Sequence, residues 1–167
     1  FKDFGARFLA ASFAALRAAQ PNPGPLRILV ATSGDTGAAV AAACHRKPGL
    51  EVGVLFPQGG VSPRPERQLT CWDANVRSFA VRGTFDDCQN MAKALFMEGD
   101  WPAEGQLTSA NSINIGRLLP QAAYAARTAS IYMAEHGVPA NVVVPSGNLG
   151  NVVGVFWAKS LGFPIGK

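Results

Sequence analysis

Three polar loops each follow a predicted strand and precede a predicted helix. They are residues 32–37 (Thr-Ser-Gly-Asp-Thr-Gly), 111–114 (Asn-Ser-Ile-Asn) and 145–151 (Pro-Ser-Gly-Asn-Leu-Gly-Asn). In a parallel sheet such loops meet at the carboxyl edge, where helix N-termini present free N–H groups and a positive dipole end. Glycines there let the backbone approach an anion closely. The loops therefore predict a site for a phosphate or a carboxylate.

A simpler interpretation is that the polar side chains only cap the helices that follow. Ser33, Asp35, Ser146 and Asn148 are all residue types that occur at helix N-caps. Three loops of this kind in one strand–helix pattern favour a ligand site over capping alone.

Nucleotide-binding and serine hydrolase sites are excluded by spacing. The chain has no G-x-x-x-x-G-K-[ST] motif, and Gly34 and Gly37 form only a GxxG. The second predicted strand ends without the acid that a ribose hydroxyl requires. Ser33 and Ser146 lack the G-x-S-x-G context of a nucleophile elbow.

Strands and helices alternate along the chain, which predicts an α/β fold with parallel sheets and flanking helices. We expect Ser62 and Thr84 to occupy N-caps, with Pro63 at a first helical position. The predicted strands are 26–31, 51–56, 76–81, 106–110 and 141–144, and the predicted helices are 4–19, 36–46, 63–72, 84–97, 115–135 and 152–159.

Composition narrows the class of protein. The 167 residues are 48% hydrophobic and carry a net charge of +4, and the arginines are scattered, which argues against a nucleic-acid partner. Cys44, Cys71 and Cys88 suggest no disulfide framework, so we expect a reducing, cytoplasmic setting. No zinc-spaced ligand set or membrane-length apolar run is present, so we expect no metal and no membrane partner. The first residue is Phe, and we expect a segment of a longer protein.

The motifs resemble those of one family. Residues 1–5 (Phe-Lys-Asp-Phe-Gly) resemble the lysine segment of the threonine synthase family. The motifs at 33–37, 111–117 and 146–151 resemble three more motifs of that family, in the same order. The resemblance implies fold type II, the tryptophan synthase beta-like group of enzymes that use pyridoxal 5'-phosphate (PLP).

The implied activity is that of a carbon–oxygen lyase acting on phosphate. PLP would form a Schiff base with Lys2, and the partner would be a small anionic amino acid, O-phospho-L-homoserine. Phosphate would leave from Cγ and water would add at Cβ to give L-threonine. A lysine serves as such a nucleophile when its amine is neutral, which burial or a neighbouring cation favours.

The resemblance also assigns roles to individual residues. Arg117 is assigned from its charge alone, and a surface arginine of a helix is the alternative. The expected cofactor-binding residues are Lys2, Gly147, Asn148, Leu149, Gly150, Asn151 and Asn114, with Lys2 also catalytic. The expected substrate-binding residues are Ser33, Asp35, Thr36, Ser112 and Arg117.

By resemblance, residues 1–105 form most of a smaller domain and residues 106–167 begin the larger domain that holds PLP. The family's partner for the pyridine nitrogen lies far downstream, so we expect this segment alone to be inactive. The alternatives are a related PLP-dependent phospho-lyase, an amino-acid dehydratase, and a non-catalytic anion-binding α/β module. Asp35 argues against a dehydratase, since those enzymes tend to have Asn there. The assembly is expected to be a monomer or a homodimer.

Overall fold

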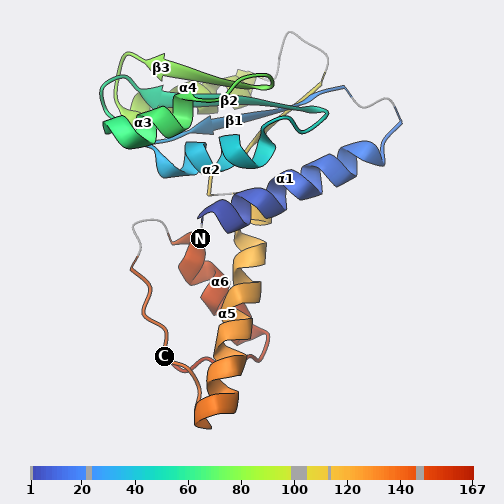
Figure 1. The fold of residues 1–167 in the computed structure, drawn as a ribbon, viewed down its shortest axis with the longest axis vertical. Coiled ribbons are helices and arrows are strands. Elements are labelled where there is room, and N and C mark those ends of the chain that lie inside the picture. The colour runs from blue at the N-terminus through green and yellow to red at the C-terminus, as the bar shows by residue number, and fades with distance from the viewer. Residues whose placement is uncertain (1, 22–23, 99–104, 113, 146–148) are drawn as a thin grey trace.

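A computed structural model describes residues 2–21, 24–98, 105–112, 114–145 and 149–167. Its centre is a four-stranded sheet in the order β3-β2-β1-β4, in which every pairing is parallel (Figure 1). The strands are β1 (Leu26–Ala31), β2 (Leu50–Pro57), β3 (Val76–Val81) and β4 (Gln106–Ser109). The helices are α1 (Lys2–Ala18), α2 (Asp35–Cys44), α3 (Pro63–Thr70), α4 (Phe85–Glu98), α5 (Ile115–His136) and α6 (Gly150–Ser160).

Helices cover both faces of the sheet, and alternation along the strands explains why. In β1, Ile28 and Val30 belong to the core shared with α1 and α2, whereas Leu29 and Ala31 belong to the core that includes Cys88 of α4. A strand whose neighbours are all parallel is buried on both faces, so it reads as a continuous apolar run. The predicted parallel α/β architecture is confirmed.

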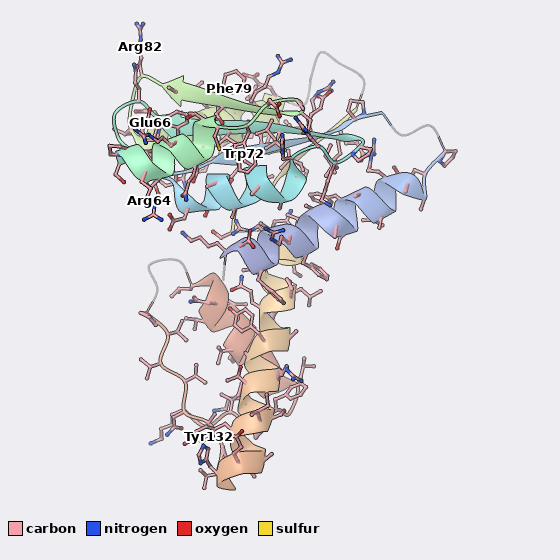
Figure 2. All side chains as sticks on the ribbon, viewed as in Figure 1. Arg64, Glu66, Trp72, Phe79, Arg82 and Tyr132 are labelled. Carbon is pink, nitrogen blue, oxygen red and sulfur yellow. The ribbon has the colours of Figure 1, made fainter. Side chains whose placement is uncertain are left out.

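The chain then leaves the sheet. α5 and α6 extend away from it and pack against each other, with Ala129 and Ala158 in their shared core (Figure 1). Figure 2 places Tyr132 near the end of α5 that is far from the sheet. Gly154 allows this close packing, because a Cβ there would lie 2.8 Å from Cβ of Gln121. The domain boundary after residue 105 stays a prediction, although β4 pairs with β1 in the first sheet.

One expected strand is absent. Residues 141–145 have no strand assignment, and the only bridge nearby joins Ala140 to Ile165 within the described residues. The amide of Val142 donates to the carbonyl of Lys167 at 3.0 Å, so a parallel pairing starts there and stops. Val143 is 93% exposed. The strand prediction for 141–144 is wrong for this chain, because a short run of valines forms a strand only beside a neighbour.

Of the two predicted N-cap residues, Thr84 forms a capping hydrogen bond and Ser62 does not. Thr84 caps α4 as expected: its hydroxyl accepts from the amide of Asp87 at 3.2 Å, and the Asp87 carboxylate accepts from the amide of Thr84 at 2.6 Å. Ser62 stands at the N-cap of α3, and Pro63 begins that helix, but the Ser62 side chain makes no capping bond.

The Asp73 carboxylate joins the end of α2 to the loop before β3 through hydrogen bonds. The stability that these bonds give the folded protein should depend on pH. His45 Nε2 lies 2.6 Å from Asp73 Oδ1, and Arg46 donates to Asp73 Oδ2 at 3.0 Å. These hydrogen bonds, first from His45 and then from Arg46, hold the pKa of Asp73 below its ordinary value. Because the pKa is lower in the folded state, the ionised Asp73 increases the free energy of unfolding at pH values above the ordinary aspartate pKa of about 4. This contribution is lost as the pH falls through the pKa of the folded state.

Asp73→Asn should therefore lower the free energy of unfolding at neutral pH, and its difference from the parent protein should shrink as the pH drops from about 5 to about 2. Denaturant titrations of both proteins across that range would measure this. Asp86→Asn removes another exposed aspartate and serves as the control. A difference for Asp73→Asn that stays constant across the range would contradict the assignment.

Candidate active site

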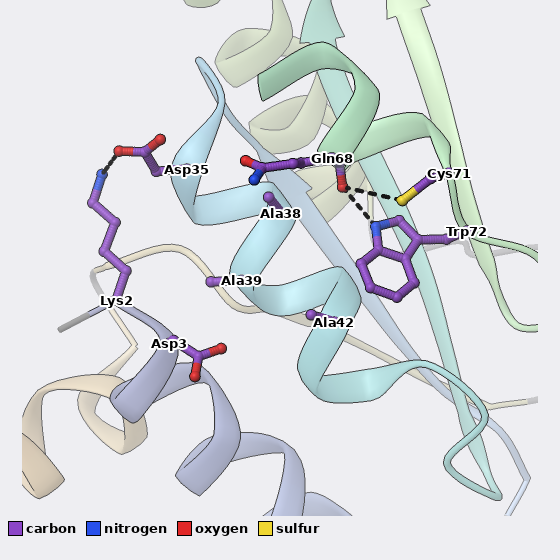
Figure 3. A pocket seen from close by; sticks show the side chains of 9 residues that line it. All are labelled: Lys2, Asp3, Asp35, Ala38, Ala39, Ala42, Gln68, Cys71 and Trp72. Atoms are coloured by element: carbon purple, nitrogen blue, oxygen red, sulfur yellow. Dashed lines mark hydrogen bonds and ion pairs between the residues drawn. The ribbon is translucent and has the colours of Figure 1, made fainter. Parts of the chain in front are cut away.

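Lys2 lies in the first turn of α1 and reaches toward the start of α2. Its Nζ lies 3.5 Å from Oδ2 of Asp35, the first residue of α2 (Figure 3). The Lys2 side chain is 29% exposed and borders a cavity of about 440 Å³ that Asp3, Asp35 and Trp72 also line. The amine is therefore held in place by a carboxylate and is still open to a small molecule.

Thr32 leaves the Asp35 carboxylate available for this contact. The hydroxyl of Thr32 accepts from the amides of Gly34 and Gly37, both at 3.0 Å. Gly34 is the N-cap of α2 and has no capping side chain, so the interpretation of Ser33 and Asp35 as caps is wrong for this helix. The Ser33 and Asp35 side chains are exposed, and Thr36 is partly buried. Gly34 has φ +143°, a backbone conformation that favours glycine.

The second loop is tied to the end of β1. The side-chain amide of Asn111 donates to the carbonyl of Ala31 at 3.1 Å. Asn114 caps α5: its Oδ1 accepts from the amide of Gly116 at 2.9 Å, and its Nδ2 donates to the carbonyl of Ser109 at 2.8 Å. Ser112 lies between them and is partly buried. The loops after β1 and β4 therefore meet at one edge of the sheet, as the sequence predicts.

Arg117 is buried and does not lie on the surface of its helix. It is 3% exposed, so the alternative of a surface arginine is wrong. Its NH1 donates to the carbonyl of Ala110 at 2.8 Å, and its buried Nε has no partner among the described residues. Burial lowers the pKa of the guanidinium from its ordinary value. Its charge is thus fixed next to the 111–114 loop, and contact with a substrate stays a prediction.

Close helix contacts bring the helix starts together. A Cβ on Gly5 would lie 2.6 Å from the carbonyl oxygen of Arg117, so the first turns of α1 and α5 touch. A Cβ on Gly150 would lie 3.0 Å from Leu118, so the start of α6 touches the same part of α5. The starts of α1 and α6 therefore both touch the start of α5, and the contact between Lys2 and Asp35 joins the start of α2 to this group.

The third loop is described only in part. Ser146, Gly147 and Asn148 lie outside the described residues. Leu149 occupies the N-cap of α6 without a capping side chain, and Asn151 is 8% exposed, with its Oδ1 accepting from the amide of Val152 at 3.1 Å. Gly150 is needed for packing against α5, a role that its expected part in cofactor binding did not include.

Sequence comparison gives the class of protein. A family model for pyridoxal-phosphate dependent enzymes matches residues 1–165, and the chain belongs to this family. It is 42% identical to threonine synthase of Haemophilus influenzae and 41% identical to that of Escherichia coli K12, in both cases over 99% of this chain and 38% of the relative. The chain thus spans about two fifths of the length of these curated relatives.

Solved structures of threonine synthases match the fold of this chain. The PLP-bound threonine synthase from Brucella melitensis matches with a TM-score of 0.86 and 34% identity, over 99% of this chain and 35% of that one. Yeast threonine synthase matches with a TM-score of 0.82 and 34% identity, over 100% of this chain and 34% of that one. The resemblance drawn from the motifs is confirmed.

Asp35→Asn should make Lys2 easier to modify in the full-length protein without cofactor. Exposed ion pairs contribute about 0.2–1 kcal/mol, so reductive methylation of Lys2 should become about 1.4- to 5-fold faster. Peptide mapping would measure the rate at Lys2. Asp3→Asn is the matched control, because Asp3 lines the same cavity but pairs with Arg7 at 2.6 Å. Equal rates in both variants would show that Asp35 does not hold the amine.

Proposed function

We propose that the complete protein is a threonine synthase, which converts O-phospho-L-homoserine and water into L-threonine and phosphate, with Lys2 carrying PLP. The observation that supports this most is the group of helix starts linked around Lys2. Identity near 40% to threonine synthases selects this activity from among those of the family.

The residues present fit the cofactor. Lys2 supplies an accessible primary amine beside a cavity. The start of α6 supplies a helix N-terminus, and helix N-termini bind phosphate through free amides and the dipole. Gly150 has no side chain of its own at that helix start, so the start of α6 packs closely against Leu118 of α5. We propose that Leu149, Gly150 and Asn151 hold the cofactor phosphate together with Gly147 and Asn148, and that Asn114 approaches the ring from the start of α5.

Each residue then has a defined task. Bound PLP supplies an electron sink that stabilises negative charge next to Cα. Lys2, once its amine is released, takes a proton from Cα and moves protons at Cβ. Ser33, Asp35 and Thr36 meet the substrate at the start of α2, where free amides favour a carboxylate.

We propose that Ser112 and Arg117 face the substrate phosphate from the start of α5. The support for Arg117 is a buried guanidinium that forms no ion pair with a carboxylate in the described part of the chain. Its Nε also lacks a partner there. A phosphate would provide the missing acceptor and the opposite charge. The substrate's C–O bond at Cγ breaks as phosphate leaves, and water supplies the hydroxyl at Cβ.

We also propose a cellular compartment and an assembly state for the protein. Cys44, Cys71 and Cys88 are free thiols, which suits a reducing compartment such as the cytoplasm. None of the described helices is long and apolar enough to span a membrane. The scattered arginines support the proposal of no nucleic-acid partner. The assembly is proposed to be a monomer or a homodimer.

Full-length protein purified with PLP should absorb near ~420 nm, and borohydride should fix the cofactor onto the peptide that contains Lys2. The protein should then release phosphate from O-phosphohomoserine. Lys2→Ala should abolish the label and reduce phosphate release by about a thousandfold or more. Lys93→Ala, on the exposed surface of α4, is the control and should retain both.

Two results would contradict the proposal in different ways. A label on another lysine would remove the role of Lys2. A label on Lys2 without release of phosphate from O-phosphohomoserine would leave a PLP enzyme but reject threonine synthase activity.

A further inference from the structure

A second arginine is buried at the opposite end of α1 from Lys2. Arg17 lies in the last turn of α1 and is 7% exposed. With a rise of 1.5 Å per residue, the two side chains leave the helix roughly 20 Å apart. This distance places Arg17 outside the group of helix starts described above.

The charge of Arg17 is only partly compensated. Its NH1 donates to Oε1 of Gln20 at 3.1 Å and to Oε1 of Gln106 at 3.4 Å. Among the described residues, its buried Nε has no hydrogen-bond partner and no carboxylate forms an ion pair with it. The negative end of the α1 dipole supplies part of the missing charge. Burying a guanidinium beside neutral amides alone remains unfavourable.

A cavity of about 440 Å³ adjoins this arginine, at the edge of the sheet formed by β4. The cavity is lined by both polar and apolar side chains. The polar lining residues are Arg17, Gln20, Gln106 and Thr108, and the apolar ones are Phe13, Leu16, Leu26 and Leu107.

We propose that this cavity binds a small organic carboxylate with a short, branched apolar chain. The carboxylate would accept hydrogen bonds from the Arg17 guanidinium and from the side-chain amide of Gln20 or Gln106, and would neutralise the buried charge. The apolar chain would pack against Phe13 and Leu26, which belong to the core between α1 and the sheet. A neutral molecule of the same shape would leave the guanidinium without a counter-charge and would bind weakly.

The experiment uses full-length protein loaded with PLP and measures its melting temperature against concentration of 4-methylpentanoate or of 4-methylpentanamide. The acid should raise Tm saturably, by about 2 °C or more, and the amide should not. Arg17→Met should remove the response to the acid. Without ligand its Tm should equal or exceed that of the parent, since an isosteric apolar side chain often replaces a buried charge without loss.

Arg127→Met, which removes an exposed arginine of α5, should respond to the acid as the parent does and controls for general charge effects. If Arg17→Met does not fold, Arg17→Gln serves the same purpose with a smaller change. No shift with the acid, an equal shift with the amide, or an undiminished shift in the Arg17 variant would each overturn the proposal.

Discussion

The close crossing of α1 over α5 is the contact on which the arrangement of the candidate site depends. It requires glycine at position 5, because a Cβ there would lie 2.6 Å from the backbone carbonyl oxygen of Arg117. Gly116 contributes on the other side, since a Cβ there would lie 2.7 Å from Leu9. The crossing joins the first turn of α1, which carries Lys2, to the first turn of α5 while α1 stays packed against α2. A larger side chain at either glycine would separate the helix starts and move the amine.

Positive charge accumulates at this crossing for reasons that the fold explains. Parallel strands direct each following helix so that its N-terminus points to the same edge, and each N-terminus carries about half a positive charge. Lys2 and the buried Arg117 add formal charges there, and Asp35 offsets one of them. An anionic cofactor and an anionic substrate suit such an environment, whereas a neutral ligand would leave it uncompensated. Electrostatics and topology therefore point to the same class of ligand.

Local patterns were sufficient to predict most elements, because β-branched runs, caps and proline stops act within a few residues. The beginning of α4 is an example, since Thr84 and Asp87 satisfy each other's amides without help from the rest of the chain. Residues 141–144 show the limit of this reasoning: their valines favour a strand, but a strand needs a neighbour, which a local pattern does not contain.

The sequence allowed the residue types of the candidate site to be predicted, but not which other residues of the chain they contact. The hydrogen bond that caps α2 comes from Thr32, the first residue of the 32–37 loop, and not from Ser33 or Asp35. A hydroxyl residue at the start of that loop was the available signal. The burial of Arg117 depends on α1, more than 100 residues earlier in the chain, so charge alone suggested a surface position. The glycines at 5 and 116 were the sequence signal for that burial.

The most direct measurement is a crystal structure of the full-length protein grown with PLP. The account predicts continuous density from Nζ of Lys2 to the cofactor, with the cofactor phosphate at the N-terminus of α6. Asp35 should no longer contact the lysine. Cofactor density attached elsewhere, or a phosphate bound away from the start of α6, would contradict the claim that these helix starts form the PLP site.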